Sequence, residues 1–206
     1  MLTDEQKKYR DRADRARREL FKEKEKFDVI SDGSGKRYRV CVYYVLSGAP
    51  EKATEYLEWF EQAFADDIGE PAFLLYAALA HYRLGSLSTA RRYLFDSMLS
   101  NIYLLPYLLS RSMPKQDMWH SSNRAQPDYI EEIEELLEEP TSQEREWISE
   151  QFDSELFMKA RSKYIETFHA LEHASELDTR RSILGDWQDY ISACRANEIL
   201  PVAARG

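Results

Sequence analysis

The sequence has few of the residues that build disulfide-linked, secreted or membrane-spanning proteins. Cysteine occurs only twice, at Cys41 and Cys194, so neither a disulfide framework nor a four-thiolate zinc site is available. No apolar run approaches the roughly 20 residues that span a bilayer, and the first residues lack the apolar stretch of a secretion signal. We therefore expect a cytoplasmic protein with no membrane attachment, in which both cysteines are small core residues.

Glycine and proline are also scarce, with seven of each in 206 residues, and several stand at regular intervals. Gly48, Gly69 and Gly85 suit helix ends that need a left-handed residue, while Pro50 and Pro71 suit the first turn of a helix. The helices expected between them cover residues 37–47, 50–65, 71–84 and 87–99. Because no segment shows the period-two alternation of a strand, the sequence predicts an all-α fold.

Cofactor motifs are missing too. The turn that ends at Gly35 is followed by a lysine, but a phosphate-binding loop also requires a glycine at position 30 and a hydroxyl residue at position 37. Ile30 and Arg37 occupy these positions. We expect no nucleotide site at this turn and no cofactor elsewhere.

Charge is distributed unevenly along the chain. Residues 1–26 hold 10 basic and 7 acidic residues, whereas residues 128–155 hold 12 acidic residues against the single Arg145. An acidic protein with a net charge of −9 lacks the basic surface that phosphate backbones require. Nucleic acid is therefore not the favoured partner. A nucleic-acid-associated factor that uses the basic segment 1–26 remains an alternative, and it predicts salt-sensitive binding.

The N-terminal segment has the pattern of an exposed helix. Thr3 and Gln6 match a capping box, and the helix expected over residues 4–26 carries a narrow apolar stripe. The stripe consists of Tyr9, Ala13, Ala16, Leu20 and Phe21. Whether this helix lies on the body of the protein, pairs with a second copy or stays mobile is left open by the sequence.

Two blocks of the sequence resemble each other at an offset of 37 residues. In each block a Leu and a Gly precede a small residue, a tyrosine and a leucine at matching positions. These are Leu46, Gly48, Ala53, Tyr56 and Leu57 in the first block, and Leu84, Gly85, Ala90, Tyr93 and Leu94 in the second. The small residue would let paired helices approach closely, and the leucine one turn later would fill the space between neighbouring hairpins.

This pattern resembles the tetratricopeptide repeat family, whose unit is a 34-residue pair of antiparallel helices. The resemblance covers residues 36–102 and departs from the family in its spacing and at Arg37, where an aromatic residue is expected. It implies a superhelix of helical hairpins, capped here by helices on both sides. The segments expected are a charged helix at 1–30, the repeat pair at 36–110, a loop at 111–126 and a helical cap at 127–206, the last forming one compact unit with the repeats.

The C-terminal third is expected to consist of helices after a polar loop. The predicted helices cover residues 127–139, 142–151, 154–176 and 179–197, and Thr141 with Glu144 forms a second capping box. The last two helices have apolar faces that suit an antiparallel pair. Within the loop, Trp119 and His120 are candidates for binding a ligand, since long loops often carry function.

The string His169-Ala-Leu-Glu172-His173 matches the H-x-x-E-H motif of inverted zinc peptidases. On a helix it places two imidazoles one turn apart, but a catalytic zinc needs a third protein ligand. Spacing alone favours none of the nearby acidic residues for that role. A zinc-dependent hydrolase at His169 and His173 remains an alternative, beside the simpler interpretation of a polar helix surface.

The sequence favours a non-catalytic adaptor that binds another protein or peptide segment, and leaves association with a second copy open. By the register of the repeat family, the first helix of each hairpin lines the binding groove. The residues expected there are Tyr38, Val42, Leu75, Leu79, Tyr82 and Arg83. Tyr82 and Arg83 offer the aromatic and guanidinium groups that dominate interface energetics. The competing interpretation is that all six belong to the core.

Overall fold

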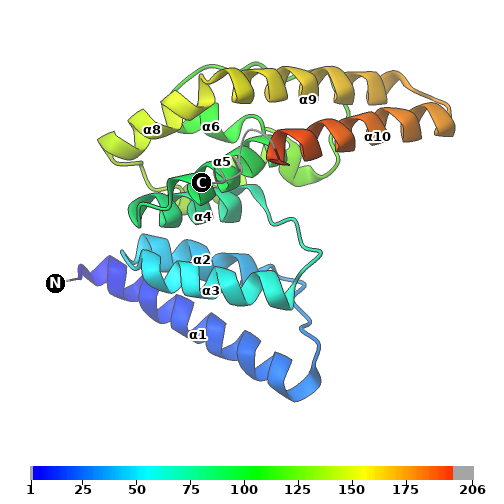
Figure 1. Ribbon diagram of the computed structural model, residues 1–206. Coiled ribbons are helices and arrows are strands. Elements are labelled where there is room, and N and C mark those ends of the chain that lie inside the picture. Colours follow the sequence, from blue (N-terminus) through cyan, green and yellow to red (C-terminus); the bar gives the residue numbers. More distant parts are fainter. Residues whose placement is uncertain (1, 197–206) are drawn as a thin grey trace, which may run out of the picture. The chain divides into compact units, whose positions relative to one another are not determined.

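The computed structural model describes residues 2–196 of the chain. In this part the fold is all-α, as predicted, with ten α-helices, two short 3-10 helices and no strand (Figure 1). The helices divide between two compact units, Met1–Tyr93 and Leu94–Gly206, with the boundary inside helix α5 (Leu87–Ser100). The segments expected from the sequence at 1–30, 36–110, 111–126 and 127–206 rest on turn signals, which mark where helices end and not which helices pack together. None of the helices in residues 2–196 is long and apolar enough to cross a bilayer.

Helix α1 (Asp4–Phe27) packs on the hairpin that follows it (Figure 1). Its capping box forms as predicted, because the Gln6 backbone N–H donates to Thr3 Oγ1 at 3.1 Å and the Thr3 N–H donates to Gln6 Oε1 at 3.0 Å. Only Ala13 and Leu20 are buried, and Phe21 lies with its ring centroid 4.4 Å from that of Trp59. The structure thus answers the question that the sequence left open: α1 lies on the body of its own unit.

The next four helices match their predicted ranges to within two residues. They are α2 (Lys36–Leu46), α3 (Pro50–Ala63), α4 (Pro71–Arg83) and α5. Gly48 adopts a left-handed conformation with φ of 72° after α2, and Pro50 and Pro71 occupy the first turns of their helices. Of the residues that align between the two sequence blocks, Leu84 is 40% exposed, whereas the small residue, the tyrosine and the leucine that follow the glycine in each block are buried. They are Ala53, Tyr56, Leu57, Ala90, Tyr93 and Leu94.

Arg37 connects two loops at the start of α2. Its guanidinium donates to Asp67 Oδ2 at 2.7 Å and lies 3.4 Å from Asp32 Oδ2. The Tyr38 hydroxyl donates to Asp67 Oδ1 at 2.8 Å, and the Gly69 N–H donates to the same carboxylate at 2.9 Å. Arg37 therefore links the turn before α2 with the turn between α3 and α4.

The second unit combines short helices, a long loop and two long helices. After α6 (Leu104–Leu108) the elements are η1 (Asn123–Ala125), α7 (Tyr129–Ile133), η2 (Glu134–Leu136), α8 (Ser142–Phe152), α9 (Glu155–His173) and α10 (Leu177–Cys194). The helix expected over residues 127–139 is wrong in its extent. The structure has only a short α-helix and a 3-10 turn there, because closely spaced glutamates repel one another along a helix.

Asn101 organises the beginning of this unit and is fully buried. Its Oδ1 accepts hydrogen bonds from the N–H groups of Tyr103 and Leu104 at 2.9 and 3.1 Å. Its Nδ2 donates to the carbonyl oxygens of Arg124 and Gln126 at 2.8 and 3.0 Å. One amide side chain thus fixes the start of α6 against the end of the loop.

The two long helices pack against each other, as the sequence predicts (Figure 1). Tyr164, Phe168 and Leu171 of α9 are buried in an aromatic cluster that also includes Trp187 of α10. On α10, Ile191 and Cys194 are buried, whereas Leu184 is exposed. Cys41 and Cys194 are both buried, as expected, and burial raises the pKa of the Cys41 thiol.

Candidate functional site

Four of the six residues predicted to line a binding groove lie in the core. Tyr38, Val42, Leu75 and Leu79 expose 5% of their surface or less. Tyr38 illustrates the reason, because its ring lies 5.5 Å from that of Phe73 on α4. The sequence pattern correctly identified apolar helix faces, but the structure covers these positions with other side chains and leaves them out of reach of a ligand.

The other two predicted groove residues, Tyr82 and Arg83, stand at the end of α4. Tyr82 is half-buried and Arg83 is exposed. The Arg83 guanidinium donates to the Val45 carbonyl oxygen at 3.0 Å, near the C-terminal end of α2, and the Gly48 N–H donates to the same oxygen at 3.0 Å. Arg83 therefore has a structural contact of its own.

Trp119 and His120, the predicted ligand-binding pair of the loop, are packed against neighbouring aromatic rings. Trp119 stacks on Phe168 with centroids 5.9 Å apart, and His120 stacks on Tyr103 at 6.3 Å. His120 is half-buried, and burial together with the nearby Lys115 lowers the pKa of its imidazole. Both residues thus help to hold the loop in place.

The structure brings an unexpected third residue to the His169 and His173 pair. The two imidazoles are exposed at the end of α9, with ring centroids 4.6 Å apart. Asp117 of the long loop lies beside them, and one ligand atom from each of the three residues falls within 4.8 Å of the others. The sequence search considered only acidic residues close to the motif or after it, so it missed Asp117.

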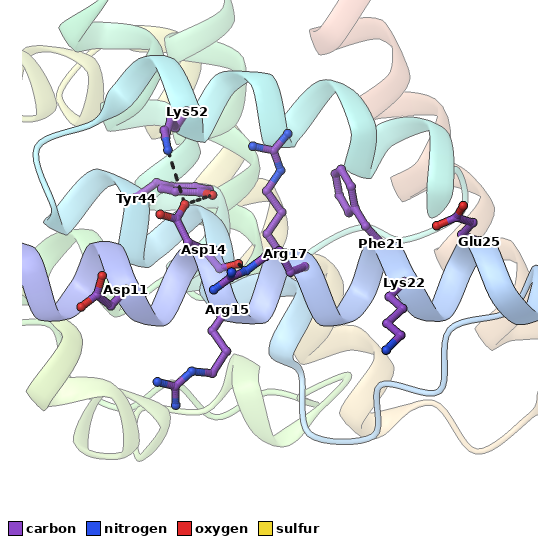
Figure 2. A pocket seen from close by; sticks show the side chains of 10 residues that line it. Asp11, Asp14, Arg15, Arg17, Phe21, Lys22, Glu25, Tyr44 and Lys52 are labelled. Carbon is purple, nitrogen blue, oxygen red and sulfur yellow. Dashed lines mark hydrogen bonds and ion pairs between the residues drawn. The ribbon is translucent and has the colours of Figure 1, made fainter.

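An open groove of about 700 Å³ runs along α1 in the first unit (Figure 2). It is lined by five basic side chains, three acidic ones and two aromatic ones. These residues are Asp11, Asp14, Arg15, Arg17, Arg18, Phe21, Lys22, Glu25, Tyr44 and Lys52. Eight of them belong to α1, so the same helix that showed a narrow apolar stripe supplies most of the groove.

A network of polar contacts fixes the inner wall of this groove. The Tyr44 hydroxyl donates to Asp14 Oδ1 at 2.8 Å, and the Lys52 ammonium lies 3.4 Å from the same oxygen. Burial alone would raise the pKa of Asp14, but the hydrogen bond from Tyr44 and the charge of Lys52 outweigh it, so this pKa is lowered. Asp14 is therefore a fixed negative charge that orients its two partners.

Arg17 and Phe21 continue the inner wall. The Arg17 guanidinium donates to Glu55 at 2.6 Å and lies 4.9 Å from the centre of the Phe21 ring. Figure 2 shows both side chains on the side of α1 that faces α3, together with Asp14. The inner charges are thus already paired within the unit.

Arg15 and Lys22 differ from these inner residues. Both are exposed, and in Figure 2 they extend from α1 in the direction away from α3. Exposed cations that are not committed to the inner wall can contact a ligand without breaking the fold. They are the residues of this groove with the clearest capacity for recognition.

Comparison with known proteins finds no matching family model, no similar curated protein and no similar solved structure.

Proposed function

We propose that the chain is a non-catalytic protein-binding module whose first unit holds an acidic segment of another polypeptide in the groove along α1. The observation that carries this proposal is the mixed but net positive lining of the groove, with five basic and three acidic side chains. The helical hairpins beside it, with their resemblance to tetratricopeptide repeats, fit a scaffold that displays a binding surface and performs no chemistry.

The lining favours a polypeptide over a nucleic acid. A phosphate backbone in this groove would lie close to the carboxylates of Asp11, Asp14 and Glu25 as well as to the cations. The negative phosphates and the negative carboxylates would repel one another. A polypeptide can present basic or neutral residues at those positions and acidic residues opposite Arg15 and Lys22. Because the inner charges are paired within the unit, the two outer cations Arg15 and Lys22 then select an acidic segment.

Aromatic side chains add a second basis for recognition. Phe21 is half-buried within the groove lining, so part of its ring is available to an apolar residue of the partner. Aromatic residues beside cations are enriched at the energetic centres of protein interfaces. We therefore expect the bound segment to combine acidic and aromatic residues.

Direct titration tests this proposal. A labelled peptide of alternating Glu and Tyr, and a labelled DNA duplex, are each titrated against the full chain and followed by fluorescence anisotropy. Replacing both Arg15 and Lys22 with Gln should weaken peptide binding about tenfold, since each of the two lost charged contacts contributes about 0.7 kcal/mol.

The matched control replaces Lys8 and Arg12 with Gln. These two residues lie on the same helix outside the groove lining. This variant has the same net charge as the first and should bind the peptide as the parent does. Circular dichroism verifies that both variants remain helical. Equal losses in the two variants, or tighter binding of the duplex than of the peptide, would contradict the proposal.

A further inference from the structure

The second unit places two imidazoles where both can face one ion. His169 and His173 are four residues apart on α9, so they lie on the same side of the helix one turn from each other. Both are exposed, so neither ring is held in the core. Neutral imidazole is the most common metal ligand in proteins.

Asp117 reaches the same place from a loop that is anchored on both sides. The Gln116 N–H donates to the Tyr103 hydroxyl at 3.0 Å, and the Met118 side chain is buried in the aromatic cluster. The Trp119 N–H donates at 3.0 Å to the carbonyl oxygen of Phe168, the residue directly before His169. The backbone around Asp117 is thus fixed relative to the helix that carries the two histidines.

From this convergence we propose that Asp117, His169 and His173 form a binding site for a divalent transition-metal ion, for which Zn²⁺ is the matching ion. The three side chains offer two nitrogens and one carboxylate oxygen, a donor set that zinc accepts in tetrahedral geometry with a fourth position open. This site lies in a different unit from the groove along α1 and does not depend on it.

The spacing suits the ion after small side-chain rotations. Tetrahedral zinc with bonds near 2.1 Å holds its ligand atoms about 3.4 Å apart, whereas the three candidate atoms lie within 4.8 Å of one another. All three residues are exposed, which leaves their side chains room to rotate by this amount. Because the backbone is anchored already, metal binding has to order only these three side chains, so the conformational entropy that it costs is small.

Binding would connect the loop to the end of α9, because the ligands come from both. The fourth position remains for water or for a side chain of a partner. Glu172 stands between the histidines in the sequence but is not part of the three-residue group. The proposal is therefore for metal binding at three residues, without a hydrolytic step.

Metal titration of the full chain, purified without a histidine tag, tests this site. Isothermal titration with Zn²⁺ should give one ion per chain. Cobalt(II) should give the strong visible absorption of a tetrahedral site. Replacing His169 or His173 with Ala, or Asp117 with Asn, should weaken Zn²⁺ binding by at least tenfold. Even the loss of a group that only supports a metal ligand typically lowers the affinity by about tenfold or more.

The control is Glu166→Gln, which removes an exposed carboxylate from the same helix and should leave the affinity unchanged. Because Asn has nearly the shape of Asp, Asp117→Asn distinguishes a three-ligand site from a mere histidine pair. Unchanged affinity in this variant, or no stoichiometric binding by the folded parent, would overturn the proposal.

Proteolysis provides a second measurement. Lys115 is exposed two residues before Asp117, so trypsin can cleave after it when the loop opens locally. Zn²⁺ should slow this cleavage in the parent and not in Asp117→Asn. Equal cleavage rates of the parent with and without saturating Zn²⁺ would contradict a metal that bridges the loop and the helix.

Discussion

The two units hold their candidate sites in different ways. In the first, α1 buries only Ala13 and Leu20, and charged hydrogen bonds such as that of Arg17 to Glu55 supplement this small apolar contact. In the second, the loop that carries Asp117 is held by Met118 in an aromatic cluster and by backbone hydrogen bonds. The same all-α fold class therefore gives one site that depends on charge and another that depends on apolar packing.

This difference indicates which solution conditions and which substitutions should lower the stability of each unit. Charged hydrogen bonds weaken when a carboxylate is protonated or when salt screens exposed partners. Buried aromatic contacts depend on shape and on removal from water, and they respond to truncation of a side chain. The three variants below test the comparison in order of expected effect.

The largest effect is expected from Phe168→Ala. Phe168 is 5% exposed, and its ring centroid lies 4.1 Å from that of Tyr164 and 5.9 Å from that of Trp119. Removing a buried phenylalanine ring lowers the free energy of unfolding by about 3–5 kcal/mol. Hydrogen exchange with mass spectrometry should show lost protection of the amides in residues 94–196.

The control for this variant is Met158→Ala, which truncates an exposed side chain of the same helix (44% exposed) and should change stability by less than about 0.5 kcal/mol. If Phe168→Ala left protection intact, the aromatic cluster would not be what stabilises the second unit.

An intermediate effect that depends on pH is expected from Asp67→Asn in the first unit. Burial alone would raise the pKa of Asp67, but hydrogen bonds from Gly69 and Tyr38 and the charge of Arg37 outweigh it, so the pKa is lowered. A carboxyl group of this kind adds stability above its unfolded-state pKa of about 3.9. That contribution is lost as the pH falls through the lower folded-state value.

The variant should therefore lower the free energy of unfolding by about 2 kcal/mol at neutral pH, and the difference from the parent should shrink as the pH falls below about 4. Urea unfolding followed by circular dichroism at several pH values measures both quantities. A difference that stays constant from neutral to acid pH would show that the charge of Asp67 does not stabilise this unit.

The smallest effect is expected from Arg83→Met. Methionine keeps an unbranched apolar chain but removes the donor to the Val45 carbonyl oxygen, which should cost about 1 kcal/mol. The control Arg39→Met, at an exposed position of α2, should have almost no effect in the same urea experiment. Unchanged stability in Arg83→Met would mean that Arg83 is available to a ligand, as the sequence predicted.

Most helix boundaries were predictable because their signals are local. The capping pairs Thr3 with Gln6 and Thr141 with Glu144 fix helix starts through contacts three residues apart. Pro50 and Pro71 likewise mark the starts of α3 and α4 in the sequence itself, because proline is tolerated in the first turn of a helix. The acidic segment after Pro127 was predicted less well. Repulsion between glutamates shortens this helix, and its strength depends on the number of glutamates that lie close together and not on a local capping motif.

The composition and periodicity of the sequence determined the all-α fold, the positions of most helices and the pairing of His169 with His173 on one face. Only the tertiary structure decided that Tyr38, Val42, Leu75 and Leu79 are covered, that α1 docks on its own unit, and that Asp117 meets the histidines. The physical reason is the range of the interactions: helix signals act over three or four residues, whereas burial and convergence depend on residues that folding brings together from distant parts of the chain.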